Sequence, residues 1–244
     1  MGDATTTEQS TGDLADFPTR WHTGLALVAH PDDPEYGMSA AVARWVGEGK
    51  RIVYALASSG EKGIAGMDPD EAGPLREQEQ REAASIVGVD EVEFWGFPDS
   101  DIANSEALRA RITETIMAVD PDVIISLFGG DHWAPGAPNQ RDHIEFAAAV
   151  VDAYDALLPR AHQRWLFENG PNASHAVEVG DEVEVAVRSL AAHRRYLEVL
   201  DPDTPVDEQA RAQIEKVTAP REDFGGRRAV AFTLVRDGDT DPDH

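Results

Sequence analysis

The 244-residue sequence contains no cysteine. Disulfides, thiolate metal sites and cysteine nucleophiles are therefore excluded, so any metal ion must be held by histidine, aspartate or glutamate together with water. No stretch reaches the roughly 18 consecutive apolar residues of a membrane-spanning helix. The polar, acidic first sixteen residues also have no apolar segment of the kind that signal peptides carry. We therefore expect a cytoplasmic protein without a membrane partner.

Positive charge is scarce in this chain. It has 21 lysines and arginines against 46 acidic residues, for a formal net charge of −25, and its lysines are Lys50, Lys62 and Lys216. This balance argues against nucleic acid, whose phosphates require basic residues, and against anionic membrane surfaces. The composition suits a salt-rich cytoplasm, although a GC-rich genome would produce the same bias. We expect a small-molecule partner and leave a homo-oligomer open.

Composition divides the chain into three regions. Residues 1–20 are rich in Thr, Asp, Gln and Gly and are predicted to be a disordered acidic tail, residues 21–236 a single domain, and residues 237–244 a polar tail. Within the domain, apolar strands alternate with amphipathic helices, which predicts right-handed βαβ units. The fold class is therefore α/β, a Rossmann-like three-layer sandwich with a mostly parallel sheet. The predicted strands are 25–29, 51–57, 92–95, 122–128, 164–168 and 229–235, and the predicted helices are 36–48, 75–87, 106–119, 144–158, 190–200 and 206–217.

A histidine and two adjacent carboxylates follow the first predicted strand, at the end of an α/β sheet where ligands bind. His30 and Asp33 offer a nitrogen and an oxygen, which suit zinc. His143 supplies a third ligand from the loop after the strand 122–128, which we expect beside the first strand. Three protein ligands with an open position are typical of a catalytic metal, which activates a bound water. Asp32 is then placed to accept a proton from that water. An alternative is that Asp32 and Asp33 only cap the following helix.

The segment Ala29-His30-Pro31-Asp32-Asp33 closely resembles the signature of the PIG-L/LmbE-like deacetylases. That family includes zinc enzymes that remove acetyl from N-acetylglucosaminyl groups. The resemblance covers about residues 25–149 and is looser in the C-terminal third. Further family features recur in order: Leu75-Arg76, Glu79 through Ala84, Gly88-Val89, Phe94 through Asp99, and Asp142-His143.

The resemblance assigns roles to several of these residues. It implies that His30, Asp33 and His143 bind Zn²⁺, with Fe²⁺ as a possible substitute, and that Asp32 is the general base. Arg76 corresponds to the family's substrate-gripping arginine, because a guanidinium can bind sugar hydroxyls or phosphate through a fork of donors. An alternative for Arg76 is a surface ion pair with Glu77 or Glu79.

The sequence departs from the family pattern at Gln140, where a histidine usually stands. Glutamine can donate a hydrogen bond to an oxyanion but cannot carry a proton. Either Asp32 therefore moves protons alone, or His132 substitutes for the missing histidine; an exposed loop histidine is the alternative for His132. Asp142 is expected to orient a neighbouring group, as carboxylates behind metal ligands do.

Together these residues predict a metal-dependent hydrolase that removes an N-acetyl group from a GlcNAc-type sugar conjugate. Trp133 could stack on a sugar ring near the site. Two alternatives stay open. One is a catalytically weakened Rossmann-like module that binds a sugar or nucleotide, and the other is an amidase acting on a non-sugar small molecule.

Overall fold

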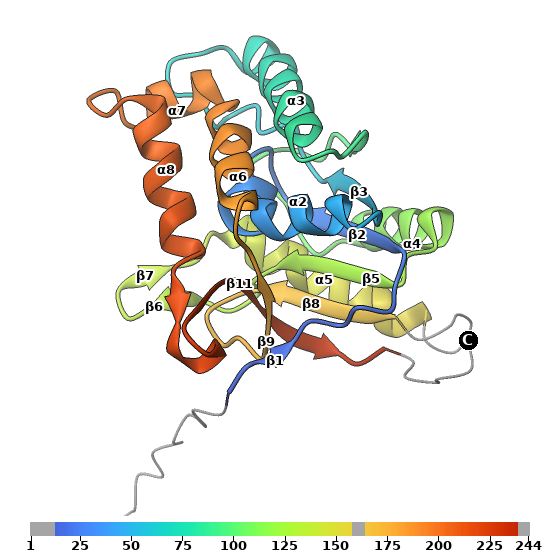
Figure 1. Ribbon diagram of the computed structural model, residues 1–244. Helices are drawn as coiled ribbons and strands as arrows, with labels where there is room; N and C mark the ends of the chain where they lie inside the picture. The colour runs from blue at the N-terminus through green and yellow to red at the C-terminus, as the bar shows by residue number, and fades with distance from the viewer. Residues whose placement is uncertain (1–12, 158–163, 239–244) are drawn as a thin grey trace, which may run out of the picture.

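The computed structural model describes residues 13–157 and 164–238, which fold around one central sheet (Figure 1). The strand order is β1-β9-β11-β8-β5-β2-β3-β4, with β10 paired to β11. Five strands form a parallel group, and β11 joins it in the antiparallel direction. The parallel strands are β2 (Thr23–Val28), β3 (Arg51–Leu56), β4 (Glu91–Phe94), β5 (Val123–Leu127) and β8 (Trp165–Asn169); the others are β1 (Ala15–Asp16), β9 (His175–Glu178), β10 (Pro220–Arg221) and β11 (Arg227–Arg236).

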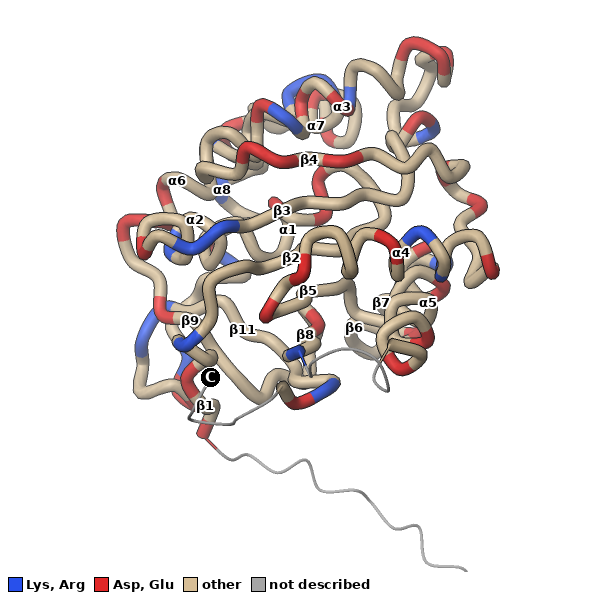
Figure 2. The backbone as a smooth tube through the Cα atoms, turned by 90° about the vertical axis from the view of Figure 1, so that its right-hand side faces the viewer, with Lys and Arg blue, Asp and Glu red and all other residues tan. Residues whose placement is uncertain are grey.

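Helices cover both faces of this sheet, which confirms the predicted three-layer α/β fold. Helices α4 and α5 pack on one face, and the remaining helices pack on the other (Figures 1 and 2). The larger layer contains α1 (Asp33–Gly37), α2 (Ser39–Gly47), α3 (Pro69–Ile86), α6 (Glu182–Ala191), α7 (Arg194–Leu200) and α8 (Val206–Val217), and the smaller one contains α4 (Glu106–Val119) and α5 (Arg141–Leu157). None of the helices described is long and apolar enough to cross a membrane.

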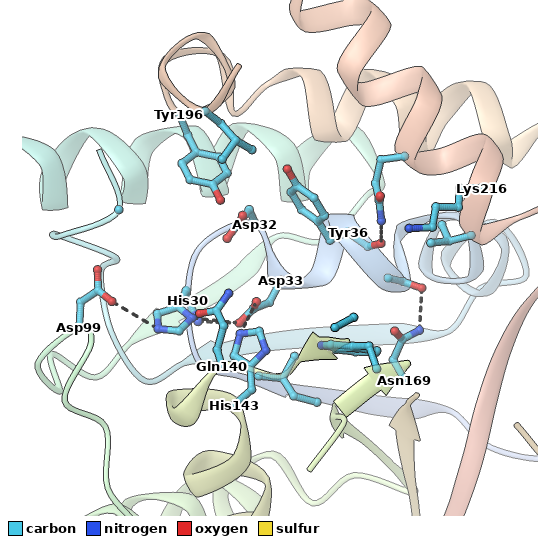
Figure 3. Close-up of a pocket in the computed structure, with 18 of the residues that line it drawn as sticks. His30, Asp32, Asp33, Tyr36, Asp99, Gln140, His143, Asn169, Tyr196 and Lys216 are labelled. Atoms are coloured by element: carbon cyan, nitrogen blue, oxygen red, sulfur yellow. Dashed lines mark hydrogen bonds and ion pairs between the residues drawn. The ribbon is translucent and has the colours of Figure 1, made fainter. Parts of the chain in front are cut away.

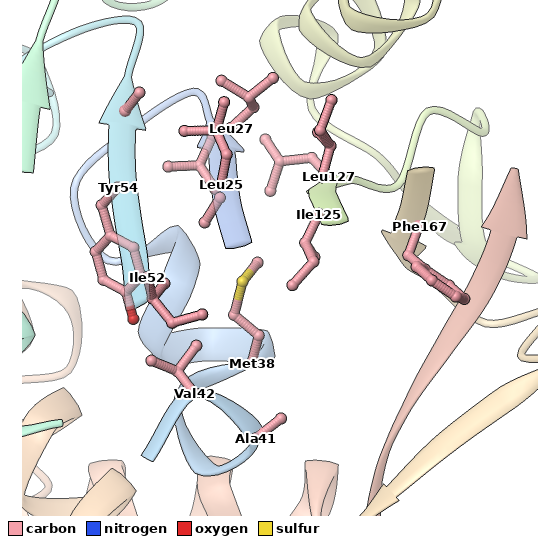
Figure 4. Close-up of a cluster of buried hydrophobic side chains, with 14 of the residues drawn as sticks. Leu25, Leu27, Met38, Ala41, Val42, Ile52, Tyr54, Ile125, Leu127 and Phe167 are labelled. Carbon is pink, nitrogen blue, oxygen red and sulfur yellow. The ribbon is translucent and has the colours of Figure 1, made fainter. Parts of the chain in front are cut away.

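The middle strands of the sheet are buried because helices cover both of their faces. Five of the six residues of β2 and all five of β5 are buried. Their side chains pack against residues of α2 and its preceding turn, such as Met38 and Val42 (Figure 4). This core fixes the carboxyl ends of β2 and β5 side by side, since the two strands pair in parallel from Gly24 and Val123 onward.

The prediction that residues 1–20 form a disordered tail is wrong for residues 13–20. Residues 1–12 lie outside the part of the chain that the structure describes. β1 adds a parallel strand beside β9. Phe17 is buried, and its ring centroid lies 4.3 Å from that of Phe167 and 4.9 Å from that of Trp45. The buried ring of Phe17 and the two paired residues of β1 attach this segment to the sheet although its composition is polar. The segment therefore belongs to the domain.

Several helix boundaries differ from those predicted. α3 begins at Pro69 rather than near residue 75, because the side chain of Asp68 accepts a hydrogen bond from the Asp70 N–H and caps it. The predicted helix 36–48 is two helices, α1 and α2, that meet at Met38. Gly37 lies at this junction, where a Cβ would come 2.5 Å from Oδ1 of Asn169. Helix α6 and strand β9 were not predicted, and α7 is separate from α6.

Candidate metal centre

The candidate site lies at the carboxyl ends of β2 and β5, as predicted (Figure 3). His30 lies two residues after the end of β2, and Asp33 begins α1. The loop after β5 forms the hairpin of β6 (His132–Ala134) and β7 (Ala137–Pro138) and then enters α5, whose first turn carries His143. The two halves of the site are thus far apart in sequence and are joined by the pairing of their strands.

His30, Asp33 and His143 come together in a geometry that could hold a metal ion, with one ligand atom from each residue within 4.8 Å of the others. Asp33 Oδ2 accepts backbone hydrogen bonds from Ala29 at 3.0 Å and from His30 at 2.7 Å. The other carboxylate oxygen of Asp33, Oδ1, lies 3.1 Å from Nε2 of His143. Within the described residues neither ring nitrogen of His143 has a hydrogen-bond partner. Nε2 of His143 and Oδ1 of Asp33 are thus two largely buried atoms 3.1 Å apart, a placement that fits two ligands of one ion.

One ring nitrogen of His30, Nε2, faces two carboxylates. Nε2 lies 3.1 Å from Asp142 Oδ2 and 3.3 Å from Asp99 Oδ1. Asp142 therefore contacts a candidate ligand, the position expected of an orienting carboxylate. Burial alone would lower the pKa of His30, but hydrogen bonds to Asp142 and Asp99 and the charge of Asp33 outweigh burial and raise it to about 10. His30, Asp99 and Asp142 form a second group close enough to hold an ion, and it shares His30 with the first.

Asp99 was not predicted as a site residue, although it ends the segment that carries the family resemblance. It follows β4, the strand next to β3. Burial alone would raise the pKa of Asp99, but hydrogen bonds from His30 and from the backbone N–H of Lys62 lower it to about 2. Its place in the family segment Phe94 through Asp99 and its position after a strand of the parallel sheet could have identified it, because parallel strands end at the same edge.

Asp32 points toward the same cavity, and its side chain does not cap α1. The residue has a left-handed backbone, with φ 88° and ψ −27°. Its Oδ1 accepts a hydrogen bond from Nη2 of Arg76 at 3.0 Å. Burial raises the pKa of Asp32, and the positive charge of Arg76 only partly offsets that rise. The helix-capping alternative for Asp32 and Asp33 is therefore wrong, since both side chains make other contacts.

Arg76 is buried rather than on the surface, so the predicted alternative of a surface ion pair is also wrong. Nη2 donates a further hydrogen bond to the carbonyl of Pro31 at 2.6 Å, and Nη1 donates to the carbonyl of Gly60 at 3.1 Å. The ring of Tyr196 lies over the guanidinium at 4.4 Å. Arg76 is therefore held in a fixed orientation between Asp32 and the cavity that it lines.

A cavity of about 770 Å³ opens from these residues. Gln140 lines it, as expected of a residue that acts on an acyl oxygen. His132 is exposed on the hairpin and is not among the lining residues, whereas the neighbouring Trp133 is. The structure thus places His132 as the exposed loop histidine of the alternative interpretation.

The C-terminal third contributes a wall of this cavity that the sequence did not indicate. The hydroxyl group of Tyr196 points toward Asp32 in Figure 3. Burial and the nearby charge of Asp32 raise the pKa of Tyr196. Other lining residues beyond residue 150 come from β8, α7 and α8: Asn169, Leu200, Gln213, Lys216 and Val217.

Residues 25–154 match the PIG-L family, described as GlcNAc-PI de-N-acetylase. This match spans more than half of the chain and includes the three candidate metal ligands, Asp32 and Arg76. The chain belongs to this family, and the resemblance found in its sequence is confirmed.

Individual relatives are distant. A diacetylchitobiose deacetylase from Thermococcus kodakarensis is 24% identical over 184 residues, which covers 69% of this chain and 68% of that protein. The N,N'-diacetylchitobiose deacetylase of Pyrococcus horikoshii, solved with its inhibitor MPG, has a TM-score of 0.77 at 18% identity and covers 89% of this chain and 85% of that chain. A 4-carboxy-2-hydroxymuconate hydratase from Pseudomonas putida has a TM-score of 0.65 at 16% identity, over 90% of this chain and 98% of that chain. The two structures share the fold, and the hydratase illustrates that the fold alone does not determine the reaction.

Proposed function

We propose that this protein is a metal-dependent hydrolase that removes an N-acetyl group from a GlcNAc-type sugar conjugate. The observation that carries this proposal is the convergence of His30, Asp33 and His143 beside Asp32 and Arg76 at the inner end of one cavity. Membership of the de-N-acetylase family and the activity of the diacetylchitobiose deacetylases support the same reaction.

The donor set fits a divalent metal with nitrogen and oxygen ligands. His30, Asp33 and His143 would hold the ion, and two imidazoles with one carboxylate suit zinc, with ferrous iron as the second candidate. The buried ring nitrogens of His143, one of them 3.1 Å from Asp33 Oδ1 and the other without a hydrogen-bond partner in the described part of the chain, support this fit. When bound, the ion would supply the Lewis acidity that activates a water and polarises the acyl group.

The protein's own groups would move the protons. Asp32 takes one proton from the attacking water and later delivers it to the departing amine nitrogen, so one carboxylate serves as base and then as acid. Arg76 holds this carboxylate in place through Nη2. Gln140 lines the cavity and can donate a hydrogen bond to the acyl oxygen as its negative charge develops.

The outer end of the cavity would receive the rest of the conjugate. Trp133 of β6 and Leu200 of α7 are partly exposed there, at 37% and 55%. Lys216 of α8 lines the same cavity and is also exposed. We infer that the sugar ring lies against the apolar side chains and that Lys216 favours conjugates with an anionic aglycone.

The test combines metal analysis with the release of free amine from N-acetylated sugars, neutral and anionic conjugates, and non-sugar amides. We expect one metal ion per chain and release that a chelator abolishes. His143→Ala should lose metal and activity together, whereas His132→Ala, a matched change of an exposed histidine, should lose neither. Metal-bound protein that releases no amine from any compound would favour a binding module, and release from non-sugar amides alone would favour the amidase.

A further inference from the structure

The backbone of Asp32 adopts a conformation that its side chain disfavours. With φ at 88° it lies in the left-handed region, where a Cβ crowds the carbonyl oxygen. The residue is buried, and its own carbonyl accepts hydrogen bonds from Glu35 and Tyr36 that start α1. Such a conformation persists only when surrounding contacts hold it.

The contact that meets the Asp32 amide comes from α3. Gln80 Oε1 accepts the hydrogen bond of the Asp32 N–H at 2.8 Å. Gln80 Nε2 donates to both carboxylate oxygens of Glu35, at 3.2 and 3.1 Å. Gln80 and Glu35 are fully buried, so water cannot replace these partners.

Glu35 determines which way the amide of Gln80 faces. Both oxygens of Glu35 accept hydrogen bonds from the NH₂ group of Gln80, and this keeps the amide oxygen of Gln80 toward the Asp32 N–H, which can only donate. His193, at the corner between α6 and α7, approaches Glu35 from the other side, with Nε2 3.1 Å from Oε2. His193 is also fully buried. Three elements distant in sequence thus meet around the carboxylate of Glu35.

We propose that Gln80, oriented by Glu35 and His193, is a positioning residue that holds Asp32 in its left-handed conformation and aims its carboxylate into the cavity. This inference rests on the proposed function for its catalytic meaning. Gln80, Glu35 and His193 are not among the residues that line the cavity, so they act through Asp32 and not on the substrate.

The geometry separates this role from metal binding. Asp33 is held by its own hydrogen bonds from Ala29 and His30, which do not involve Gln80. Without Gln80 the buried Asp32 N–H loses its hydrogen-bond acceptor. Asp32 then reaches a lower conformational energy by leaving the left-handed region. The base would then turn away while the three candidate ligands stay together.

The first experiment replaces Gln80 by methionine, which has a similar volume and no amide. We expect Gln80→Met to lower kcat by about 10- to 100-fold, the range found when a group that orients a metal ligand is removed, with KM and bound metal unchanged. Gln78→Met is the control, because Gln78 lies on the same helix and is exposed. An unchanged kcat, or a loss of metal that accounts for the loss of activity, would overturn the proposal.

The second experiment exchanges the two partners. Gln80→Glu alone would oppose two carboxylates in a buried space and should lower kcat as well. Adding Glu35→Gln restores an acceptor for Asp32 and a donor between positions 80 and 35, and we expect it to recover most of the lost kcat. A double variant no more active than Gln80→Glu would contradict an orienting role.

A structural measurement separates this inference from the proposed function. If the wild-type chain releases no amine, the function fails, but the inference is still tested by a crystal structure of Gln80→Met. We expect Asp32 to have left the positive-φ region in that variant. The same left-handed conformation without Gln80 would overturn the inference, whatever the enzyme does.

Discussion

Replacing Gly63 by alanine should disturb Arg76 without touching a metal ligand. A Cβ at Gly63 would overlap Nη1 of Arg76 and lie 3.0 Å from its Cζ. Ordinary contacts between carbon atoms are about 3.5–4.0 Å, so Cζ must move by roughly 0.5–1 Å and the overlapping Nη1 must move farther than that. The end of an arginine side chain can move, but here it is held by hydrogen bonds to Gly60, Pro31 and Asp32.

The size of the effect follows from which contacts are lost. A hydrogen bond from a charged donor contributes about 1.5–3 kcal/mol. Loss of the hydrogen bond from Nη1 to Gly60 should therefore lower the free energy of unfolding by about this amount. A displacement of about 1 Å at a positioned group can lower the rate about 100-fold. We therefore expect Gly63→Ala to fold, to keep its metal and to lose most of its kcat/KM.

Urea unfolding, metal analysis and amine-release kinetics measure these three quantities on the same preparation. Gly47→Ala is the matched control, because a Cβ there meets nothing within 4 Å and its φ is not positive. It should keep full activity. A folded Gly63→Ala protein with wild-type kcat/KM would refute the view that the fixed position of Arg76 supports Asp32.

Three further predictions address the rest of the structure. Phe17→Ala should lower the free energy of unfolding by about 3–5 kcal/mol, as for other buried phenylalanines, and a loss below about 1 kcal/mol in urea unfolding would show that residues 13–20 add little. Asp142→Asn should weaken metal binding by about 10-fold or more, because it removes a carboxylate 3.1 Å from His30, and competition with a chelator measures this; unchanged affinity would argue against its orienting role. Lys216→Gln should lower kcat/KM about 5-fold for anionic conjugates only, because an exposed ion pair contributes up to roughly 1 kcal/mol. Arg211→Gln on the same helix is its control, and an equal loss with both variants or with neutral conjugates would exclude a local contact.

The regular elements could be predicted where local signals agree. The helices at 106–119 and 206–217 have the predicted bounds, and Ser105 caps the first of them through the N–H of Leu108. Helix α6 has buried residues at Val183, Ala186, Val187 and Leu190, a helical spacing that was present in the sequence. Its β-branched residues do not favour a helix by themselves, so packing decides its structure.

The candidate site divides in the same way. His30, Asp32, Asp33 and His143 follow from short motifs at the ends of strands, where the fold class alone brings them together. Tyr196 could not be predicted, because it reaches Asp32 through the packing of α7 and leaves no motif. Polar contacts between distant helices depend on side-chain geometry that the order of residues does not specify.

The hydrogen bond between Glu35 and His193 has a consequence for how this enzyme family could diversify. The family match ends at residue 154, yet part of the cavity wall comes from α7 and α8. A chimera that grafts the last third of a relative onto this chain would exchange the part of the cavity that we propose meets the aglycone and leave the candidate metal ligands in place. We expect such a chimera to be active only when the grafted segment places a histidine opposite Glu35. A new substrate specificity could then be transferred with the whole C-terminal third, but only from relatives that carry this histidine.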